Sequence, residues 1–161
     1  MDAMPDSTFD ETTESQSSGW HALGPHRYRV VGRFFWLETR GAFTAEHADP
    51  FLTELLALQG SRPDVGLYVD AAKGLTVTPE CRRIMAERST KDALPLPTAV
   101  VGGSLLVRTV FSLLVNAIRL LGKQDIPIGF FRDPAEAMAW LEAQAAERMK
   151  RVLAAPPAHR P

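Results

Sequence analysis

Apolar residues gather in short uninterrupted runs along the chain, and each run leads into a polar or glycine-bearing turn followed by a helical pattern. Three such runs occupy residues 65–70, 98–103 and 126–131. Strands that are apolar throughout and alternate with helices are typical of a parallel sheet covered by helices. The pattern predicts an α/β fold with a mostly parallel sheet flanked by helices.

The region before these runs predicts an N-terminal β-hairpin that precedes the βα units. Residues 27–31 and 33–40 are rich in β-branched and aromatic side chains, and Gly32 lies at the turn between them. Side chains of the second run alternate between two faces, which is the period of a β-strand. The two alternating sets are Phe34, Trp36 and Glu38, and Phe35, Leu37 and Thr39.

The first predicted helix lies between Thr44 and Leu58, and its start is open to two interpretations. Thr44 is one candidate N-cap and leaves Pro50 as a kink inside the helix. Asp49 is the other candidate and puts Pro50 at the first helical position. Gly60 is expected to end the helix.

Three further helices are predicted behind the apolar runs. Thr78 is a candidate N-cap for a charged helix over residues 79–91. A third helix is predicted over residues 104–121. Asp133, followed by Pro134, has the pattern of a cap with proline at the first position, and it opens the last helix.

The length of 161 residues favours a single domain between two polar ends. Residues 1–25 are rich in Ser, Thr, Asp and Glu and lack apolar periodicity, so we expect a disordered acidic tail. Residues 26–150 are expected to form the α/β domain. Residues 151–161 are expected to form a second disordered tail.

Charge is unevenly distributed, although the net charge is only −1. Residues 1–19 hold five acidic residues and no Lys or Arg, whereas the rest of the chain carries 18 basic and 14 acidic residues. That excess is too small and too scattered to indicate a nucleic-acid partner. Cys81 is the only cysteine, and no apolar leader segment is visible, so we expect a cytoplasmic protein without disulfides or a membrane span.

Residues suited to metal binding or nucleophilic catalysis form no recognisable pattern. No pair among His21, His26, His47 and His159 has the i, i+4 spacing of a helical metal site. A Gly-x-Ser-x-Gly elbow is absent, and Cys81 is expected to be a buried structural thiol. We therefore expect no metal, no cofactor and no enzymatic activity.

Polar residues and glycines follow the apolar runs at 65–70 and 98–103. Carboxyl ends of parallel strands meet at one sheet edge, where open α/β folds bind ligands. Small residues before a helix let a backbone approach closely, and the helix N-terminus favours anions. In the alternative interpretation these residues only close turns and cap helices. The candidate ligand-binding residues are Asp70, Lys73, Thr76, Thr78, Gly102, Gly103 and Ser104.

The third helix has an apolar arc far wider than contact with one sheet requires. Arg108 and Arg119 bracket only ten residues, which excludes a membrane span. Three alternatives stay open: a helix covered on two sides, the wall of an apolar pocket, or a dimer or partner surface. For the partner surface, Phe111 and Val115 flank the polar stripe and are the expected rim. The polar stripe itself is Arg108, Ser112, Asn116, Arg119 and Lys123.

The order of elements, together with several local patterns, resembles the SpoIIAA-like (STAS/SEC14-type) domains over residues 27–146. A flavodoxin-like fold is disfavoured, because the first two strands are joined by a tight turn. The patterns are Gly41-Ala42-Phe43-Thr44, Tyr68-Val69-Asp70, Ala99-Val100-Val101-Gly102, and Phe131-Arg132-Asp133 entering a helix with Trp140-Leu141.

The resemblance implies a regulatory domain without enzymatic activity, although one family feature is missing. In the anti-sigma-factor antagonists of this family, the third strand ends in Asp-x-Ser and a partner kinase phosphorylates the serine. The matching residues here are Asp70-Ala71-Ala72, so position 72 has no hydroxyl group. Whether Thr76 or Thr78 replaces it stays open, and the phosphorylation switch is not carried over.

Two functions are therefore predicted from the sequence. The first is a non-enzymatic STAS-like interaction module that acts through a protein partner or as a homodimer. The alternative is a carrier or sensor that binds a small apolar or anionic ligand at the strand-end loops, in the manner of the SEC14-type domains.

Overall fold

The computed structural model of the chain describes residues 19–91, 96–122 and 126–155. Its strands are β1 (His21–Leu23), β2 (His26–Val31), β3 (Phe34–Glu38), β4 (Gly41–Phe43), β5 (Gly66–Asp70), β6 (Leu75–Val77), β7 (Thr98–Val101) and β8 (Ile128–Phe131). Its helices are α1 (Ala45–Ser61), α2 (Pro79–Lys91), α3 (Leu105–Gly122) and α4 (Pro134–Ala154).

The main sheet has six strands in the order β1-β2-β3-β5-β7-β8. The first three strands pair antiparallel as a meander, and β3, β5, β7 and β8 pair parallel. Because β2 runs opposite to β3, Arg27 at its start lies across from Glu38 at the end of β3. A separate parallel pair joins β4 to β6. The mostly parallel sheet and the N-terminal hairpin are as predicted.

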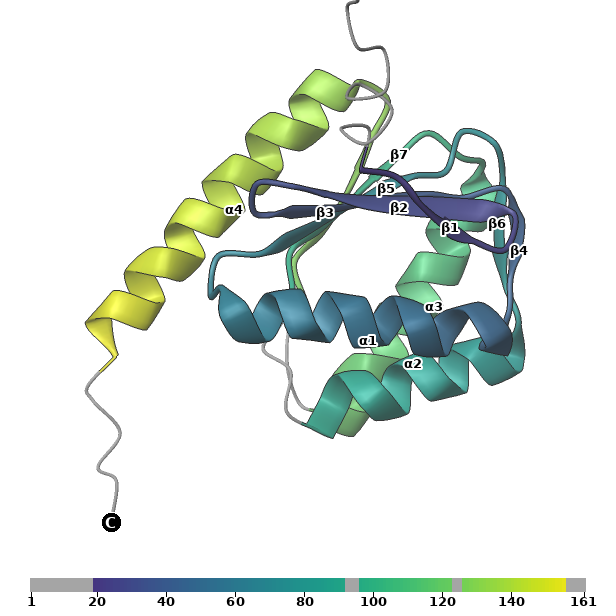
Figure 1. Ribbon diagram of the computed structural model, residues 1–161, viewed down its shortest axis with the longest axis horizontal. Helices are drawn as coiled ribbons and strands as arrows, with labels where there is room; N and C mark the ends of the chain where they lie inside the picture. Colours follow the sequence, from purple (N-terminus) through teal and green to yellow (C-terminus); the bar gives the residue numbers. More distant parts are fainter. Residues whose placement is uncertain (1–18, 92–95, 123–125, 156–161) are drawn as a thin grey trace, which may run out of the picture.

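Helices cover both faces of this sheet, with α1, α2 and α3 on one face and α4 on the other (Figure 1). Alternate strand residues therefore point into two different cores. Side chains such as Phe35, Leu37, Val69 and Val100 pack with α1, α2 and α3. The core under α4 contains Phe34, Tyr68, Ala99, Val101, Ala137, Leu141 and Ala145. The alternation predicted for β3 is confirmed.

Local capping signals set the helix starts. α1 begins after Thr44, whose backbone N–H donates to His47 Nδ1 at 3.2 Å, and Pro50 lies inside the helix. The first of the two predicted starts is therefore correct. Thr78 Oγ1 accepts from the backbone N–H of Cys81 at 3.3 Å at the start of α2. Asp133 accepts from the N–H of Ala135 at 2.9 Å at the start of α4.

Three short strands were not predicted, and the domain extends beyond its predicted limits. β1 lies within residues 1–25, and α4 continues to Ala154, so both predicted tail boundaries are wrong where the structure describes them. Residues 1–18 and 156–161 lie outside the described residues. Three-residue strands such as β4 and β6 are too short to show a periodicity, and their pairing depends on distant parts of the chain.

Candidate functional site

Asp70 ends β5 at the carboxyl edge of the sheet and closes the loop that follows. Its Oδ1 accepts from the backbone N–H of Ala72 at 3.0 Å, which is a local Asx turn. The buried Thr39 hydroxyl donates toward the backbone oxygens of Asp70 and Gly74, at 3.2 and 3.0 Å. The predicted alternative, in which Asp70 stabilises its own turn, is the arrangement observed.

Lys73 binds the buried carboxylate of Glu38, with Nζ 2.8 Å from Oε1. Arg27 and Arg40 also pair with this carboxylate, at 2.7 and 3.0 Å. Hydrogen bonds from Lys73 and Arg27 lower the pKa of Glu38 to about 2. Three cations thus surround one carboxylate at the ends of β3 and β5, and Lys73 belongs to this cluster.

Thr76 and Thr78 lie in or beside the small second sheet. Thr76 is exposed on β6, where it pairs with Ala42 of β4. Thr78 caps α2 through its hydroxyl group. The two threonines therefore have different surroundings, and Thr78 has a structural role that explains its presence.

Gly102 and Gly103 form the turn between β7 and α3, with φ of +71° and +83°. A Cβ on Gly102 would lie 3.1 Å from Cα of Ala72, so the loops after β5 and β7 meet here. Glycine is needed both for the positive φ and for this close approach. Ser104 caps α3 with its backbone oxygen, which accepts from the N–H of Val107 at 3.0 Å.

An open pocket of about 280 Å³ lies beside this turn. It is lined by Gly102, Gly103, Leu105, Arg108, Phe131 and Arg132. Its charged lining residues are both arginines, one from the first turn of α3 and one from the end of β8. The pocket is therefore suited to a small anionic group.

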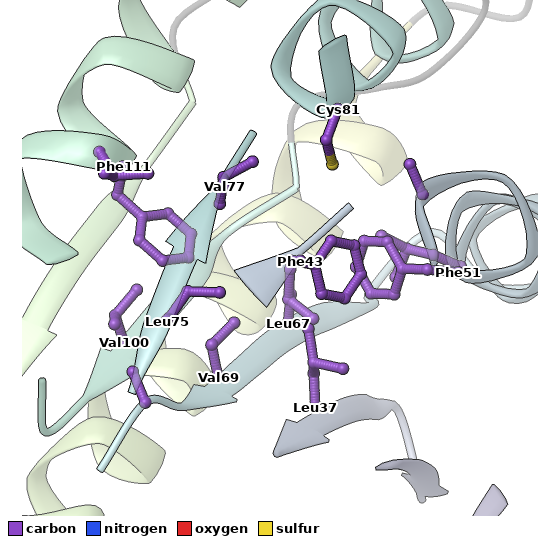
Figure 2. Packing of buried hydrophobic residues seen from close by; sticks show 14 of the residues in the cluster. Leu37, Phe43, Phe51, Leu67, Val69, Leu75, Val77, Cys81, Val100 and Phe111 are labelled. Atoms are coloured by element: carbon purple, nitrogen blue, oxygen red, sulfur yellow. The ribbon is translucent and has the colours of Figure 1, made fainter. Parts of the chain in front are cut away.

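The predicted partner surface on α3 has to be corrected, because Phe111 and Val115 are buried, with 9% and 8% of their surface exposed. Figure 2 shows Phe111 pointing from α3 toward Leu75 and Val100 of the strands. Phe111 also packs edge-on against Phe130, with ring centroids 6.3 Å apart. Arg108 and Arg119 lie on the exposed side, as predicted.

Leucines are exposed on another strip of α3. Leu106, Leu113 and Leu120 are 58%, 53% and 82% exposed. They are spaced seven residues apart, which is two helical turns, so they share one side of the helix. We call these three residues the leucine stripe. α3 is covered by the sheet and by α2, whose Ala86 packs with Leu114 and Ile118, and the stripe lies outside both contacts.

An apolar gap of about 30 Å³ lies between α1, α2 and α3 and the strands that they cover. Its lining is apolar, and the space is about that of one water molecule. In this conformation the gap is too small for an acyl chain. Of the three alternatives for α3, the wall of an apolar pocket finds no support in a gap this small.

Sequence reasoning missed several residues that the structure brings to the same edge. Arg132 directly follows a predicted strand, so the sequence was sufficient to predict its position at a strand end. The pairing of Arg27 with Glu38 follows from the hairpin register around Gly32. Trp20 had no such signal, because it lies in the range predicted as tail.

The remaining candidate groups are structural. Burial raises the pKa of the Cys81 thiol to about 11, which fits the expected buried thiol. Among the described residues, no group of three His, Cys, Asp or Glu side chains is arranged to hold a metal ion. None of the helices in the described ranges has the length and apolar character needed to cross a membrane.

Comparison with known proteins shows the fold. The sequence matches no protein-family model and no curated protein. Its structure is similar to that of an uncharacterized protein of the DUF3478 family with a SpoIIAA-like fold from Shewanella loihica PV-4. The TM-score is 0.51 at 14% identity, and the match covers 74% of this chain and 92% of that protein. The chain therefore has a SpoIIAA-like fold, as the sequence resemblance predicted.

A second similar structure is the anti-sigma factor antagonist SpoIIAA in its unphosphorylated form. Here the TM-score is 0.44 at 11% identity, with coverage of 73% of this chain and 97% of that protein. A shared fold does not transfer a function, so the function of this chain has to be argued from its own surface.

Proposed function

We propose that this protein is a non-enzymatic regulatory or interaction module that binds a protein partner through the leucine stripe of α3. The observation that carries the proposal is the exposure of Leu106, Leu113 and Leu120 on one side of a helix whose opposite side is fully packed. Single exposed leucines need no explanation, but an apolar row along one helix is typical of an interface.

The polar and charged residues around the leucine stripe support a protein partner. Ser112 and Asn116 lie on the neighbouring polar side of α3 and are exposed, as are Arg108 and Arg119. An apolar centre with a polar rim is the usual anatomy of a protein–protein interface. A partner that presents an apolar groove would cover the leucines, and a second copy of this chain is one such partner.

Photo-crosslinking in the host cell tests this function at single-residue resolution. A photoreactive p-benzoylphenylalanine at position 113 is expected to capture a protein, either another protein or a second copy. The matched control is the same group at position 112, which is exposed on the polar side of α3. Equal capture at both positions, or none at 113, would contradict the proposal.

The second candidate function is a sensor or carrier for a small anion, and the pocket beside Gly102 and Gly103 favours it. Arg108 and Arg132 are its charged lining residues, and its volume of about 280 Å³ suits a phosphate or carboxylate group. A thermal-shift screen with inorganic phosphate, acyl phosphates and nucleotides tests this function. The expected stabilisation should be lost in Arg132→Gln, and no stabilisation by any probe would exclude it.

A further inference from the structure

A second surface, on β2 and β3 with the preceding Trp20, combines tryptophan and basic side chains. The Arg29 guanidinium lies between the rings of Trp20 and Trp36, 4.5 and 5.0 Å from their centroids. Arg27 also lies over Trp20, at 4.4 Å. Arg29 and Trp36 are register partners on β2 and β3, so the stack is built on two paired strands. We call Trp20, Arg27, Arg29 and Trp36, with the neighbouring Arg40 and Lys73, the Arg–Trp patch.

Positive charge exceeds negative charge in this patch. Arg27, Arg40 and Lys73 all share the single carboxylate of Glu38, and Arg29 adds a fourth cation. The side chains of Arg27, Arg40 and Lys73 are 42% to 53% exposed, so an anion in solution can reach them. Glu38 and its register partner Asp70 on β5 supply two carboxylates against these four cations, so two positive charges remain and the patch attracts further carboxylates.

Hydrogen-bond acceptors are also in short supply at the centre of the patch. The Arg29 Nε and Trp36 Nε1 groups are buried, and neither has an acceptor among the described residues. Buried N–H groups nearly always have a partner. These two groups are covered by the stacked rings, so the attraction for an acidic occupant comes from the exposed cations Arg27, Arg40 and Lys73.

The sequence directly before Trp20 has the complementary chemistry. Residues 1–18 contain five carboxylates and no Lys or Arg. Five residues lie between Glu14 and Trp20, and the six Cα-to-Cα steps of an extended chain span at most about 20 Å. A tether this short gives an effective concentration in the millimolar range. No other part of the chain combines this charge with attachment to the patch itself.

We propose that the Arg–Trp patch binds the acidic residues 2–14 of the same chain. The contact is electrostatic, between these carboxylates and the cations around Trp20, and it neutralises the surplus charge that Glu38 leaves.

Tryptophan indole signals in NMR spectra of the full chain test this binding. The variant carries neutral amides in place of the five acids, and Trp140, which packs against Phe131 at the other end of the sheet, is the internal control. At 20 mM salt the Trp20 and Trp36 signals should differ between wild type and variant. At 1 M salt this difference should disappear, because the Debye length is then only about 3 Å. Identical signals at 20 mM salt would overturn the proposal. The five changes are Asp2→Asn, Asp6→Asn, Asp10→Asn, Glu11→Gln and Glu14→Gln.

Carbodiimide crosslinking distinguishes the possible occupants, because it joins carboxylates to a nearby lysine. Residues 2–14 should link to Lys73 at least tenfold more than to Lys150, which lies on the exposed side of α4, and 1 M salt should abolish the link. The bond between Lys73 and Glu38 supplies an internal positive control. An equal mixture of isotopically light and heavy chains identifies the source, since links between light and heavy peptides would assign the patch to a second copy and overturn the same-chain proposal.

Discussion

The ammonium group of Lys73 lies 2.8 Å from Oε1 of Glu38, and this contact joins the loop after β5 to the end of β3. Glu38 is one of the few charged residues that the fold buries, and Arg27 and Arg40 satisfy its carboxylate from other sides. The cluster is a structural centre at the edge of the sheet where sequence reasoning expected a ligand.

Glu38→Gln should lower the free energy of unfolding by about 1–3 kcal/mol, because it removes the carboxylate with which three cations form ion pairs. The loss is limited because the cations are about half exposed and remain hydrated. Urea unfolding measures the change. Glu87→Gln is the matched control, since its pair with Arg83 is exposed, and it should change stability by less than about 0.5 kcal/mol. Equal effects of both changes would mean that the cluster stabilises nothing.

The same carboxylate predicts a loss of stability in acid. The pKa of Glu38 is about 2 in the folded chain, below its ordinary value of 4.5. A carboxyl with a lowered folded-state pKa contributes stability above its unfolded pKa, and this contribution is lost as the pH falls from about 4.5 toward 2. Wild type should therefore lose more stability than Glu38→Gln over this range. Parallel pH profiles of the two proteins would contradict the account.

His26 predicts a second, separate pH dependence. Its Nδ1 accepts from the N–H of Arg40 at 2.9 Å, so Nε2 carries the proton and donates to the oxygen of Ala42 at 3.0 Å. Burial lowers the pKa of His26 below 6.5, and the neighbouring His47 adds to the shift. The neutral ring is favoured, so stability should be full above about pH 6.5 and fall as the pH drops below it.

A melting profile between pH 7.5 and 5 measures this effect, and His26→Gln should flatten it. NMR titration of the His26 ring provides a direct check on its pKa. A pKa at or above 6.5 in the folded chain would contradict the assignment.

Two substitutions on α3 separate its core side from its surface side. Val115→Asp places a charge in the packed core and should cost more than about 3 kcal/mol. Leu113→Asp lies on the exposed leucine stripe and should change stability by less than about 0.5 kcal/mol. Circular dichroism with urea unfolding compares the two. A folded, stable Val115→Asp variant would show that the core assignment of α3 is wrong.

Local patterns in the sequence were enough to predict most of the fold. The caps at Thr78 and Asp133 marked the starts of α2 and α4, and the apolar runs located β5, β7 and β8. The start of α1 stayed open, because Pro50 suits both a first position and a tolerated interior one. β4 and β6 were missed, since three residues carry no period and pair only when the chain has folded.

The candidate site was harder to predict, because its residues depend on tertiary contacts. A helical wheel shows that α3 has a wide apolar arc, but it does not show which part α2 and the sheet cover. Phe111 and Val115 were therefore placed on the surface, whereas the exposed apolar residues of α3 in the described ranges are Leu105, Leu106, Leu113 and Leu120. Lys73 was assigned to a ligand loop, because its partner Glu38 comes from a strand 35 residues earlier.

Affinity purification of the tagged full chain from host cells, with quantitative mass spectrometry, tests the central proposal most directly. Leu113→Asp is compared with Ser112→Asp, which introduces the same charge one residue away on the polar side of α3. A protein recovered with wild type and Ser112→Asp should fall at least tenfold with Leu113→Asp, and sedimentation velocity detects the case in which that protein is a second copy. Equal recovery and equal sedimentation of all three forms would contradict an interface at the leucine stripe.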